Sequence, residues 1–436
     1  MQAFVLSLYS LLTWALQPLI RLRLKRRAVK EPMYGQWLTE RFGEYSQQPS
    51  SGWVWIHAVS LGETRAAAIL LRELRSQIPD LKLLLTHGTA TGREEGAKLL
   101  QGGDIQVWQP WDNAAATQKF IAHFKPRIGI VMETEVWPNL CAAAKAANVP
   151  MALANARLNE KSQRKALRLA WLAKPTYASF TQVLAQTQND AERLRSVGAQ
   201  EVRVLGNVKY DVMPSADLMH QGQQFKASAP NKRVILLASS REGEEALFLE
   251  KIRQLASVNT AQSAIKSIAS ITHENIQWMI VPRHPQRFDE VQRLIEQAGL
   301  SVSRRSAWGD APKDADVWLG DTMGEMPLYF ALADIALLGG SFAPLGGQNL
   351  IEAIASGCPV VMGPHTFNFA EACNTAEKQG ASLRSADIAH AVALAVKTVQ
   401  NSHEMQKLKN QGEDWLNESR GASQRMALAI TQQLAG

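Results

Sequence analysis

The chain has 436 residues and a formal net charge of +7, and 46% of its residues are hydrophobic. This length predicts two domains of roughly 200 residues each, and the hydrophobic share excludes a disordered or fibrous chain. The three cysteines form no CxxC pair, so we expect reduced thiols in a reducing compartment rather than a disulfide framework. The positive charge indicates an anionic partner but does not choose between nucleic acid, phospholipid and phosphorylated metabolites.

The N-terminal segment has an uneven distribution of charge. Residues 1–20 carry no charged side chain, and residues 21–30 hold six Lys or Arg. A cleavable signal peptide has the reverse order. Twenty residues are about enough to cross a bilayer, but polar residues dilute the hydrophobicity and Pro18 bends or ends a helix. We expect a membrane-associated helix that spans the bilayer or lies in one leaflet, with the rest of the chain on the cytoplasmic side. The alternative is a helix packed on the body of the protein.

From residue 53 onward, short apolar runs alternate with helical stretches. The runs of the first array are 54–59, 81–86, 128–132, 151–154 and 202–206. The polar stretch 210–233 then interrupts the alternation and is predicted to be a connection with some helix. The runs of the second array are 233–240, 278–285, 316–321, 335–342 and 359–364. Two successive arrays predict two doubly wound domains with parallel sheets rather than one closed barrel. Residues 256–276, rich in Ser, Ala and Thr, are predicted to be a surface elaboration.

Polar side chains follow several of the strands predicted in the first array. In HAVSLGETRAA (57–67), Ser60 fits the N-cap of a helix and Glu63 the N3 acid of a capping box. The other polar residues after strands are His87, Glu133, Glu135, Asn155, Arg157 and Lys209. Ligands bind at the carboxyl ends of such strands, so this accumulation predicts a site. We expect the helix N-terminus to keep Glu63 ionised, and we interpret His57, inside a strand, as a core histidine.

The second array contains a glycine-rich turn, GGSFAPLGGQNLIEAIASGCP (339–359), which leads into a helix predicted to begin near Asn349. Backbone amides in such a turn can approach an anion. Glu352 suits ribose hydroxyls, and Arg283 in VPRHP suits a phosphate. The turn matches neither GxGxxG nor a P-loop, so neither a dinucleotide nor a triphosphate is indicated. DAD (314–316) directly precedes a predicted strand and is interpreted as a solvated turn, so no metal site is expected.

Seven segments in order resemble one family over nearly the whole chain. They are HAVSLGE, METEVWPN, NARL, VPRHP, GDTMGE, GGQNLIEA and MGPHTFNF, and they closely resemble the 3-deoxy-D-manno-octulosonic acid (Kdo) transferases of lipopolysaccharide synthesis. The resemblance implies a GT-B fold, in which two Rossmann-like domains face a central cleft. It also implies transfer of Kdo from CMP-Kdo to a hydroxyl of the lipid A precursor (lipid IVA), by direct displacement with a glutamate base, without metal or cofactor, at the cytoplasmic face of the inner membrane.

The resemblance assigns roles residue by residue. Glu63 matches the catalytic base, and Glu133 and Lys209 match residues that stabilise the transition state. The matches to CMP-binding segments are Pro282, Arg283, Met323, Gly324, Glu325, Asn349, Leu350, Ile351 and Glu352. The chain departs from the family at Gln348 and Arg241, where histidine is expected or common. Both departures concern donor binding rather than the reaction.

The predicted organisation assigns 1–30 to a membrane anchor with its basic segment and 31–210 to an acceptor-binding Rossmann-like domain. A linker at 211–232 and a CMP-sugar-binding Rossmann-like domain at 233–436 follow. The expected partners are CMP-Kdo, the lipid A precursor and anionic inner-membrane lipid. Nucleic acid is not expected, because the basic residues cluster beside the apolar N-terminus without an RNA-binding motif. The alternatives are a GT-B enzyme that uses a UDP-sugar and a non-catalytic lipid A-binding protein of the membrane surface.

Overall fold

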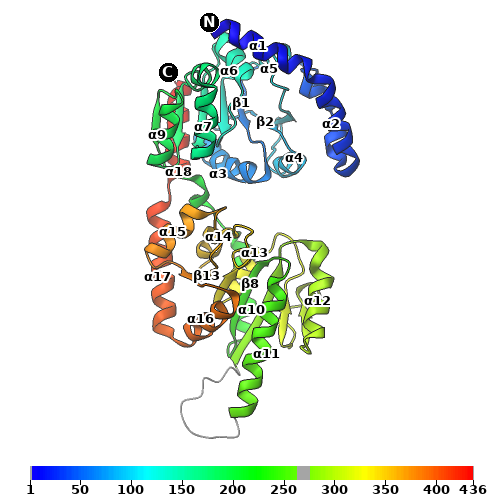
Figure 1. Ribbon diagram of the computed structural model, residues 1–436, viewed down its shortest axis with the longest axis vertical. Helices are drawn as coiled ribbons and strands as arrows, with labels where there is room; N and C mark the ends of the chain where they lie inside the picture. The colour runs from blue at the N-terminus through cyan, green and yellow to red at the C-terminus, as the bar shows by residue number, and fades with distance from the viewer. Residues whose placement is uncertain (1, 263–274, 436) are drawn as a thin grey trace. The chain divides into compact units, whose positions relative to one another are not determined.

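The computed structural model describes residues 2–262 and 275–435. The chain divides into two compact units, here described separately (Figure 1). Unit 1 contains the residues up to Asp211 and those from Ser419 onward, and unit 2 contains Val212–Glu418. Part of the predicted surface elaboration continues a helix, α11 (Glu244–Gln262). Residues 263–274 of the predicted elaboration lie outside the described residues.

The described part of unit 1 is built on a sheet of seven parallel strands in the order β3-β2-β1-β4-β5-β6-β7. The strands are β1 (Val54–His57), β2 (Leu83–His87), β3 (Ile105–Trp108), β4 (Ile128–Met132), β5 (Met151–Ala156), β6 (Gln182–Ala185) and β7 (Val202–Val204). All side chains of β1, β2, β4 and β5 are buried, as expected for a parallel sheet covered on both faces. The doubly wound prediction is therefore confirmed for this unit.

Helices cover both faces of this sheet. The helices are α3 (Leu61–Gln77), α4 (Ala90–Ala97), α5 (Ala114–Phe124), α6 (Pro138–Ala146), α7 (Glu160–Arg168), α8 (Ala170–Tyr177), α9 (Gln188–Ser196) and α18 (Ala422–Ala435), with a 3₁₀ turn, η3 (Val208–Asp211). Apolar residues of α5, α6 and α9 form one core with the sheet. Those of α3 and α18 form the core on the opposite face. The short loops at the carboxyl ends of the strands carry polar residues.

The described residues of unit 2 form a second sheet of seven parallel strands, in the order β10-β11-β9-β8-β12-β13-β14. The strands are β8 (Arg233–Ser240), β9 (Ile276–Pro282), β10 (Val302–Arg304), β11 (Val317–Leu319), β12 (Ile335–Leu338), β13 (Val360–Met362) and β14 (Leu383–Arg384). Besides α11, the helices are α10 (Ala216–Ser228), α12 (Phe288–Gln297), α13 (Met326–Leu332), α14 (Leu350–Ala355), α15 (Ala370–Lys378), α16 (Ile388–Gln400) and α17 (Ser402–Ser419). The second parallel-sheet α/β domain is also confirmed.

The domain boundaries differ from the prediction at two places. The predicted linker 211–232 contains α10, which belongs to unit 2 and packs against α13. The predicted C-terminal domain does not extend to the end of the chain, because α18 packs against α3 in unit 1. The carboxylate of Asp211 accepts hydrogen bonds from the backbone N–H groups of Gly421 and Ser423, both at 2.6 Å. These bonds hold the start of α18 in unit 1.

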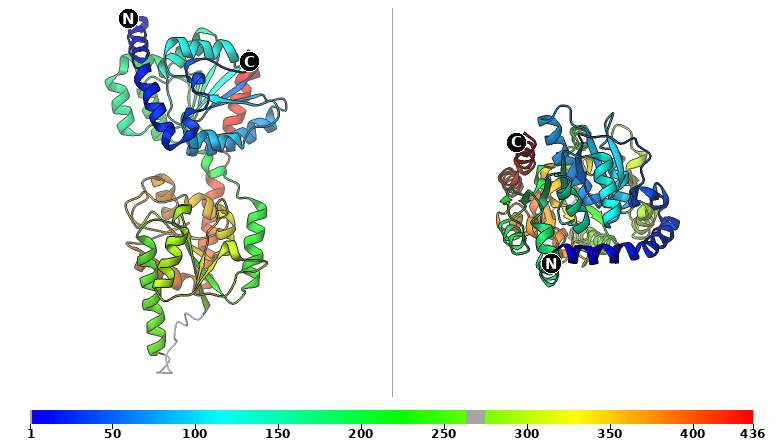
Figure 2. Two further views of the ribbon diagram at one scale, coloured as in Figure 1. Left: turned by 90° about the vertical axis from the view of Figure 1, so that its right-hand side faces the viewer. Right: turned by 90° about the horizontal axis from the view of Figure 1, so that it is seen from above.

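The N-terminal segment forms two helices, α1 (Gln2–Ala15) and α2 (Gln17–Lys30), along one edge of unit 1 (Figure 2). Among the described residues, no single helix is long and apolar enough to cross a membrane. Val5–Ala15 and Gln17–Lys30 together meet the criteria of length and composition, but they are bent by 46°. The predicted membrane-associated helix is thus not confirmed and stays a prediction.

Candidate functional site

Glu63 lies in the first turn of α3, directly after β1. Its backbone N–H donates to the Ser60 hydroxyl at 3.4 Å, which confirms Ser60 as the N-cap. The carboxylate accepts a hydrogen bond of 2.6 Å from the backbone N–H of Val59. The bond fixes the carboxylate at the carboxyl end of β1, where ligands of such sheets bind.

Burial raises the pKa of Glu63 to about 7. The N–H of Val59 opposes this shift, and the nearby charges of Glu135 and Glu133 add to it. The helix N-terminus, which was expected to keep Glu63 ionised, therefore does not hold its pKa at or below the usual value, because desolvation outweighs the favourable hydrogen bond. A carboxyl group with a pKa near 7 is suited to general-base chemistry at neutral pH.

Glu133 follows β4 and joins Lys209 and Arg157 in a charged cluster. One carboxylate oxygen accepts from Lys209 Nζ at 2.8 Å, and the other accepts from Arg157 Nε at 2.7 Å. The side chain of Glu133 is only 2% exposed, whereas those of Lys209 and Arg157 are 30% and 54% exposed. Both oxygens of Glu133 are thus engaged, and the two cations form the accessible part of the cluster.

The backbone directly after β4, at Glu133, and near the end of β5, at Asn155 rather than after the strand as predicted, adopts an uncommon conformation that supports this cluster. Glu133 and Asn155 have φ values of 57° and 52°, in the left-handed region that non-glycine residues seldom adopt. The Asn155 side chain accepts from the N–H of Val208 at 3.1 Å, and the Asn207 side chain accepts from the N–H of Lys209 at 3.0 Å. These bonds fix η3 and hence the position of Lys209. Strained residues of this kind cluster at active sites.

Two histidines near this site are structural. His57 is fully buried and its Nδ1 lies 2.8 Å from Thr86 Oγ1, which agrees with its interpretation as a core residue. His87 was grouped with the site residues because it follows a strand, but it too is fully buried, with its Nδ1 2.9 Å from the carbonyl of Ala58. Burial lowers the pKa of His57 to about 4 and that of His87 to about 3. Both rings are therefore neutral at physiological pH.

Unit 2 places a group of cations at the carboxyl ends of β8 and β9, which are neighbours in its sheet. Arg241 follows β8 and Arg283 follows β9, and the N–H of Arg283 donates to the carbonyl of Ser240 at 3.1 Å. The pKa of His284 is lowered, first by burial and then by the charges of Arg241, Arg283 and Arg287. This edge of unit 2 is therefore electropositive and suited to an anionic ligand.

The first part of the glycine-rich turn already holds an anion of the protein itself. The carboxylate of Glu244, at the start of α11, accepts from the N–H groups of Gly340 at 2.8 Å, Phe342 at 3.2 Å and Arg241 at 2.9 Å. Its side chain is buried. The expectation that these glycine-rich amides receive a ligand anion is wrong for Gly340 and Phe342, because Glu244 occupies them. The turn is instead fixed beside Arg241.

The structure brings the segments predicted to bind CMP to one edge of the second sheet, at the carboxyl ends of β11, β9 and β12; β11 and β9 are neighbours, and β8 lies between β9 and β12. Pro282, Leu350 and Ile351 are buried, so their side chains pack in the core. Asn349 caps α14 and accepts from the N–H of Ile351 at 3.1 Å. The remaining predicted residues are Met323, Gly324, Glu325, Arg283 and Glu352, and these are exposed or half-buried.

Glu325 is held by neighbours that the sequence did not indicate. Its carboxylate accepts from Arg305 Nη2 at 3.3 Å and from the Thr322 hydroxyl at 2.5 Å. Gly324, with φ of 81°, requires a backbone conformation that glycine adopts without strain. The turn from Thr322 to Glu325 is thus ordered by its own side chains.

The two departures from the family pattern lie on either side of one residue. A Cβ atom added to Gly340 would lie 3.3 Å from Gln348 Nε2 and 3.4 Å from Arg241 Cγ. Arg241 and Gln348 therefore flank the same glycine, although 107 positions separate them in the sequence. The two positions at which the resemblance leads us to expect histidine therefore lie close together at the electropositive edge.

The described chain shows no arrangement for a metal. Within residues 2–262 and 275–435, no group of three or more His, Cys, Asp or Glu side chains lies together in a way that could hold an ion. In the DAD segment, Asp316 accepts from the N–H of Ser301 at 2.8 Å and from its hydroxyl at 2.6 Å. Asp316 therefore fixes a turn against the neighbouring strand.

Comparison with known proteins identifies relatives over the whole chain. Residues 36–212 match the family described as 3-Deoxy-D-manno-octulosonic-acid transferase (kdotransferase). A 3-deoxy-D-manno-octulosonic acid transferase of Bordetella pertussis is 43% identical over 97% of this chain and 98% of its own.

Solved structures share the two-unit fold at low identity. A glycosyltransferase from Rickettsia africae is 12% identical, with a TM-score of 0.55 over 90% of this chain and 99% of its own. A UDP-GlcNAc 2-epimerase from Neisseria meningitidis is 16% identical, with a TM-score of 0.54 over 88% of this chain and 99% of its own. At this identity the likeness extends to the fold alone, and it agrees with the GT-B architecture.

Proposed function

Because the chain belongs to the 3-deoxy-D-manno-octulosonic acid (Kdo) transferase family of glycosyltransferases, we propose that it moves Kdo from CMP-Kdo to a hydroxyl of lipid IVA. The observation that carries this proposal is the half-buried Glu63, whose pKa is raised to about 7 beside the Glu133–Lys209–Arg157 cluster. Assay of the purified protein with CMP-Kdo and lipid IVA, with products resolved by mass, tests it directly. Transfer from a UDP-sugar, or no transfer at all, would contradict it.

The proposed reaction is a direct displacement at the ketose carbon of Kdo. Glu63 takes the proton of the acceptor hydroxyl while the oxygen of that hydroxyl forms a bond to the ketose carbon. At the same time, the bond between the ketose carbon and the phosphate oxygen of CMP breaks. The transition state has oxocarbenium character, and CMP leaves as a stable anion. Lys209 and Arg157 keep exposed donor groups that suit the anionic groups of the substrates. Glu133, with both oxygens engaged, then acts by holding these two cations.

The donor is proposed to bind at the electropositive edge of unit 2. Arg283 and Arg241 supply positive charge for the phosphate and the Kdo carboxylate, and the ordered turn from Thr322 to Glu325 lies at the same edge. CMP should therefore raise the thermal unfolding midpoint, and UDP should not. Arg283→Ala should weaken CMP binding about tenfold or more, the scale for loss of one charge-assisted contact. Isothermal titration measures both effects, and preference for UDP would contradict the proposed donor.

Arg241 gives this donor site a property that its relatives with histidine would lack. An arginine stays charged at every physiological pH. Arg241 should therefore add no pH dependence to CMP affinity between pH 6 and 8. Arg241→His should instead bind CMP more weakly as the pH rises through about 6.5, where histidine loses its proton. CMP titrations of the wild type and the variant at several pH values test this. The matched control is Arg253→His, at an exposed position of α11. An equal pH dependence in wild type and variant would show that Arg241 does not contact the donor.

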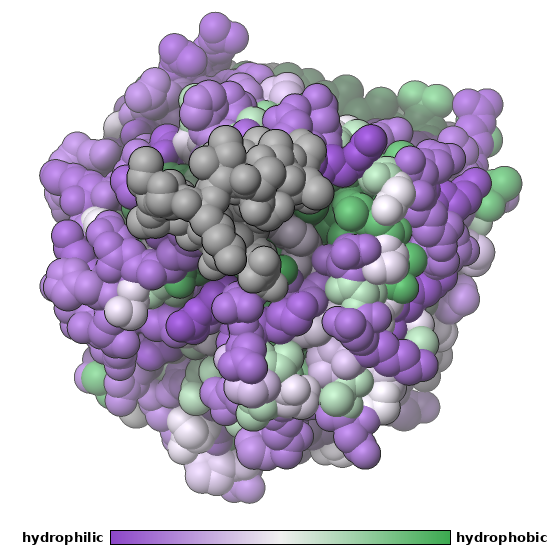
Figure 3. Space-filling view, turned by 90° about the horizontal axis from the view of Figure 1, so that it is seen from below, coloured by the Kyte–Doolittle hydropathy of each residue, from purple (hydrophilic) through white to green (hydrophobic). Residues whose placement is uncertain are grey.

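We further infer that the enzyme works at the cytoplasmic face of the inner membrane. Large exposed apolar side chains gather on the N-terminal helices and on α8, which packs against α1. They are Leu8, Leu11, Leu12, Trp14, Leu16, Leu19, Leu22, Leu169 and Trp171. Exposed cations accompany them on α2 and α7, whereas the face of unit 2 drawn in Figure 3 is mostly hydrophilic. Apolar side chains flanked by cations are typical of a surface that rests on anionic lipid.

Removal of residues 2–30 should weaken membrane binding. The six cations at 21–30 contribute roughly 1 kcal/mol each near an anionic leaflet, less when salt screens them. The truncated protein should float poorly with anionic vesicles yet still turn over saturating acceptor in detergent, because Glu63, Glu133 and Lys209 are untouched. Equal flotation of the truncated and full-length proteins would show that another surface meets the bilayer.

A further inference from the structure

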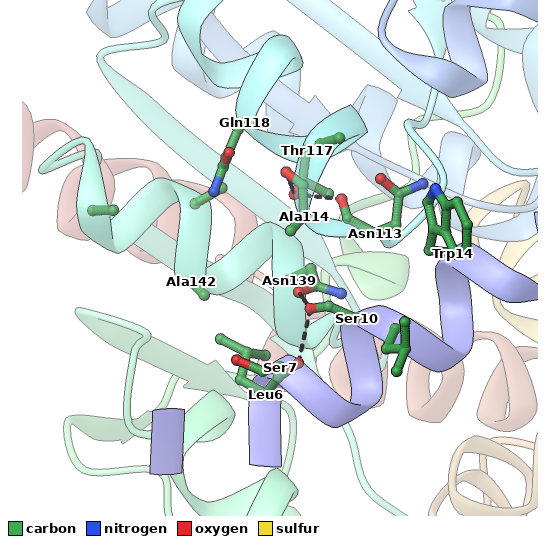
Figure 4. Close-up of a pocket in the computed structure, with 14 residues that line it drawn as sticks. Leu6, Ser7, Ser10, Trp14, Asn113, Ala114, Thr117, Gln118, Asn139 and Ala142 are labelled. Atoms are coloured by element: carbon green, nitrogen blue, oxygen red, sulfur yellow. Dashed lines mark hydrogen bonds between the residues drawn. The ribbon is translucent and has the colours of Figure 1, made fainter. Parts of the chain in front are cut away.

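A cavity of about 620 Å³ lies between α1 and the pair α5–α6 in unit 1 (Figure 4). Its volume is in the usual range for sites of small organic ligands, roughly 300–1,000 Å³. None of the described residues that line it is ionisable, and α5 and α6 line it largely with alanine. Ala114 and Ala142 lie on facing helices in Figure 4, with Leu6 and Trp14 of α1 beside them. Small side chains on one wall leave a slot of apolar character.

Helix α1 presents its polar side to the protein and its apolar side to the outside. Tyr9 donates to Asp112 at 2.9 Å, Ser10 donates to Asn139 at 2.5 Å, and the carbonyl of Thr13 accepts from Trp111 Nε1 at 3.0 Å. Leu11 and Trp14, by contrast, are 60% and 62% exposed. A helix on a water-facing surface has the reverse arrangement. The cavity therefore lies directly beside an outward apolar strip.

One polar group of a cavity-lining residue has no hydrogen-bond partner among the described residues. Asn113 is 2% exposed, and its Oδ1 caps α5 by accepting from the N–H of Ala116 at 2.9 Å. Its Nδ2 is buried and makes no hydrogen bond to any of the described residues. A buried donor without a partner is costly. The alanine walls of the cavity suit an occupant with an extended apolar body.

A fatty acyl chain has these properties. Its methylenes suit the alanine walls, and the carbonyl oxygen of its ester or amide accepts one hydrogen bond. A nucleotide does not fit, because none of the described lining side chains carries a positive charge to meet its phosphate. The exposed cations of α2, which follows α1, match the phosphates that accompany such chains in membrane lipids.

One wall of the cavity also starts close in the sequence to the candidate catalytic segment. Helix α6, which forms one wall, begins at Pro138, five residues after Glu133. Asn139 lines the cavity in the first turn of that helix. We propose that the cavity takes one acyl chain of the lipid acceptor and so aligns the acceptor with unit 1. This inference rests on the proposed function, because it assumes that the acceptor is a lipid.

Filling the slot tests the proposal. Ala142→Phe, with Ala142→Leu as a milder variant, should raise the KM for the acylated acceptor about tenfold or more. A tenfold rise in KM corresponds to the loss of binding free energy when about two methylenes of the acyl chain no longer fit in an apolar site. The KM for the same acceptor without fatty chains, and kcat for both, should stay within about twofold. The matched control is Ala122→Phe, an exposed position of α5 outside the cavity. Thermal unfolding verifies that each variant is folded.

A binding measurement keeps this proposal separable from the proposed function. An acceptor analogue with a photoreactive fatty chain should label peptides of α5 and α6 in the wild type and much less in Ala142→Phe. Labelling elsewhere, or an unchanged KM in both filling variants, would overturn the cavity proposal while the transferase function stands. Equal labelling by a photoreactive phospholipid would overturn the assignment to the acceptor. Failure of the wild type to transfer Kdo to either acceptor would instead contradict the proposed function.

Discussion

Glu63→Gln is expected to lower turnover by about a hundredfold or more, the usual scale for loss of a general base. Glutamine keeps the shape of the side chain, and its carbonyl oxygen can still accept from the N–H of Val59, as the carboxylate does at 2.6 Å. It cannot take a proton from the acceptor hydroxyl. The measurement is steady-state turnover with CMP-Kdo and acceptor, beside CMP affinity, which should not change because Glu63 lies in unit 1.

The pH dependence of turnover provides a second readout for Glu63. Its pKa is raised to about 7, so the ionised form that acts as a base is gained as the pH rises. Turnover of the wild type should therefore increase through about pH 7 and then level off. Glu63→Gln should lose this dependence. A variant that retains the same pH profile would assign the titration to another group.

Stability distinguishes catalysis from a purely structural role of the same residue. Because the folded-state pKa of Glu63 is raised, the folded protein binds this proton more tightly than the unfolded chain, and its stability falls as the pH rises from about 4.5 to 7. Removing the charge should relieve this loss. Glu63→Gln should thus unfold at the same temperature as the wild type or higher at pH 8. A variant with wild-type turnover and a lower midpoint would show that Glu63 only caps α3.

Much of the fold follows from simple patterns in the sequence. Buried parallel strands are continuous apolar runs, and each predicted run contains or overlaps a strand of the structure. The strands that were not predicted include β3, β10 and β14, which lie at sheet edges. Polar Gln106 and Ser303 interrupt β3 and β10, and β14 spans two residues, so none of the three forms a continuous apolar run. The remaining one, β6, is short, with Gln182 at its start.

The contacts that sequence analysis missed join residues far apart in the chain. The apolar face of α18 shows that the helix packs, but it does not name α3 as its partner. Glu244 is one of several acids after β8, and nothing local shows that it receives amides nearly a hundred positions later. The roles of Glu63 and Glu133 were drawn from resemblance, and they stay predictions. Their environment, a desolvated base and a carboxylate held by two cations, emerges only from the folded structure.

The cluster around Glu133 allows its role to be decided by combining two substitutions. Glu133→Gln is expected to lower turnover by about a hundredfold, the scale for loss of one preorganised electrostatic contact. The amide can accept from only one of the two cations, so either Lys209 or Arg157 loses the partner that it has now at 2.8 or 2.7 Å. Lys209→Met should have a loss of similar size.

The double variant separates a positioning role from direct stabilisation of the sugar. If Glu133 acts through the two cations, much of its effect already disappears with Lys209, and the combined loss should fall well below the product of the single losses. If the carboxylate instead faced the positive charge that develops on Kdo, the losses would multiply. We expect the first outcome, because the Glu133 side chain is only 2% exposed and both of its oxygens are engaged. Turnover is measured for the folded single and double variants. Multiplicative losses would show that the Glu133 carboxylate stabilises the charge on the reacting sugar directly.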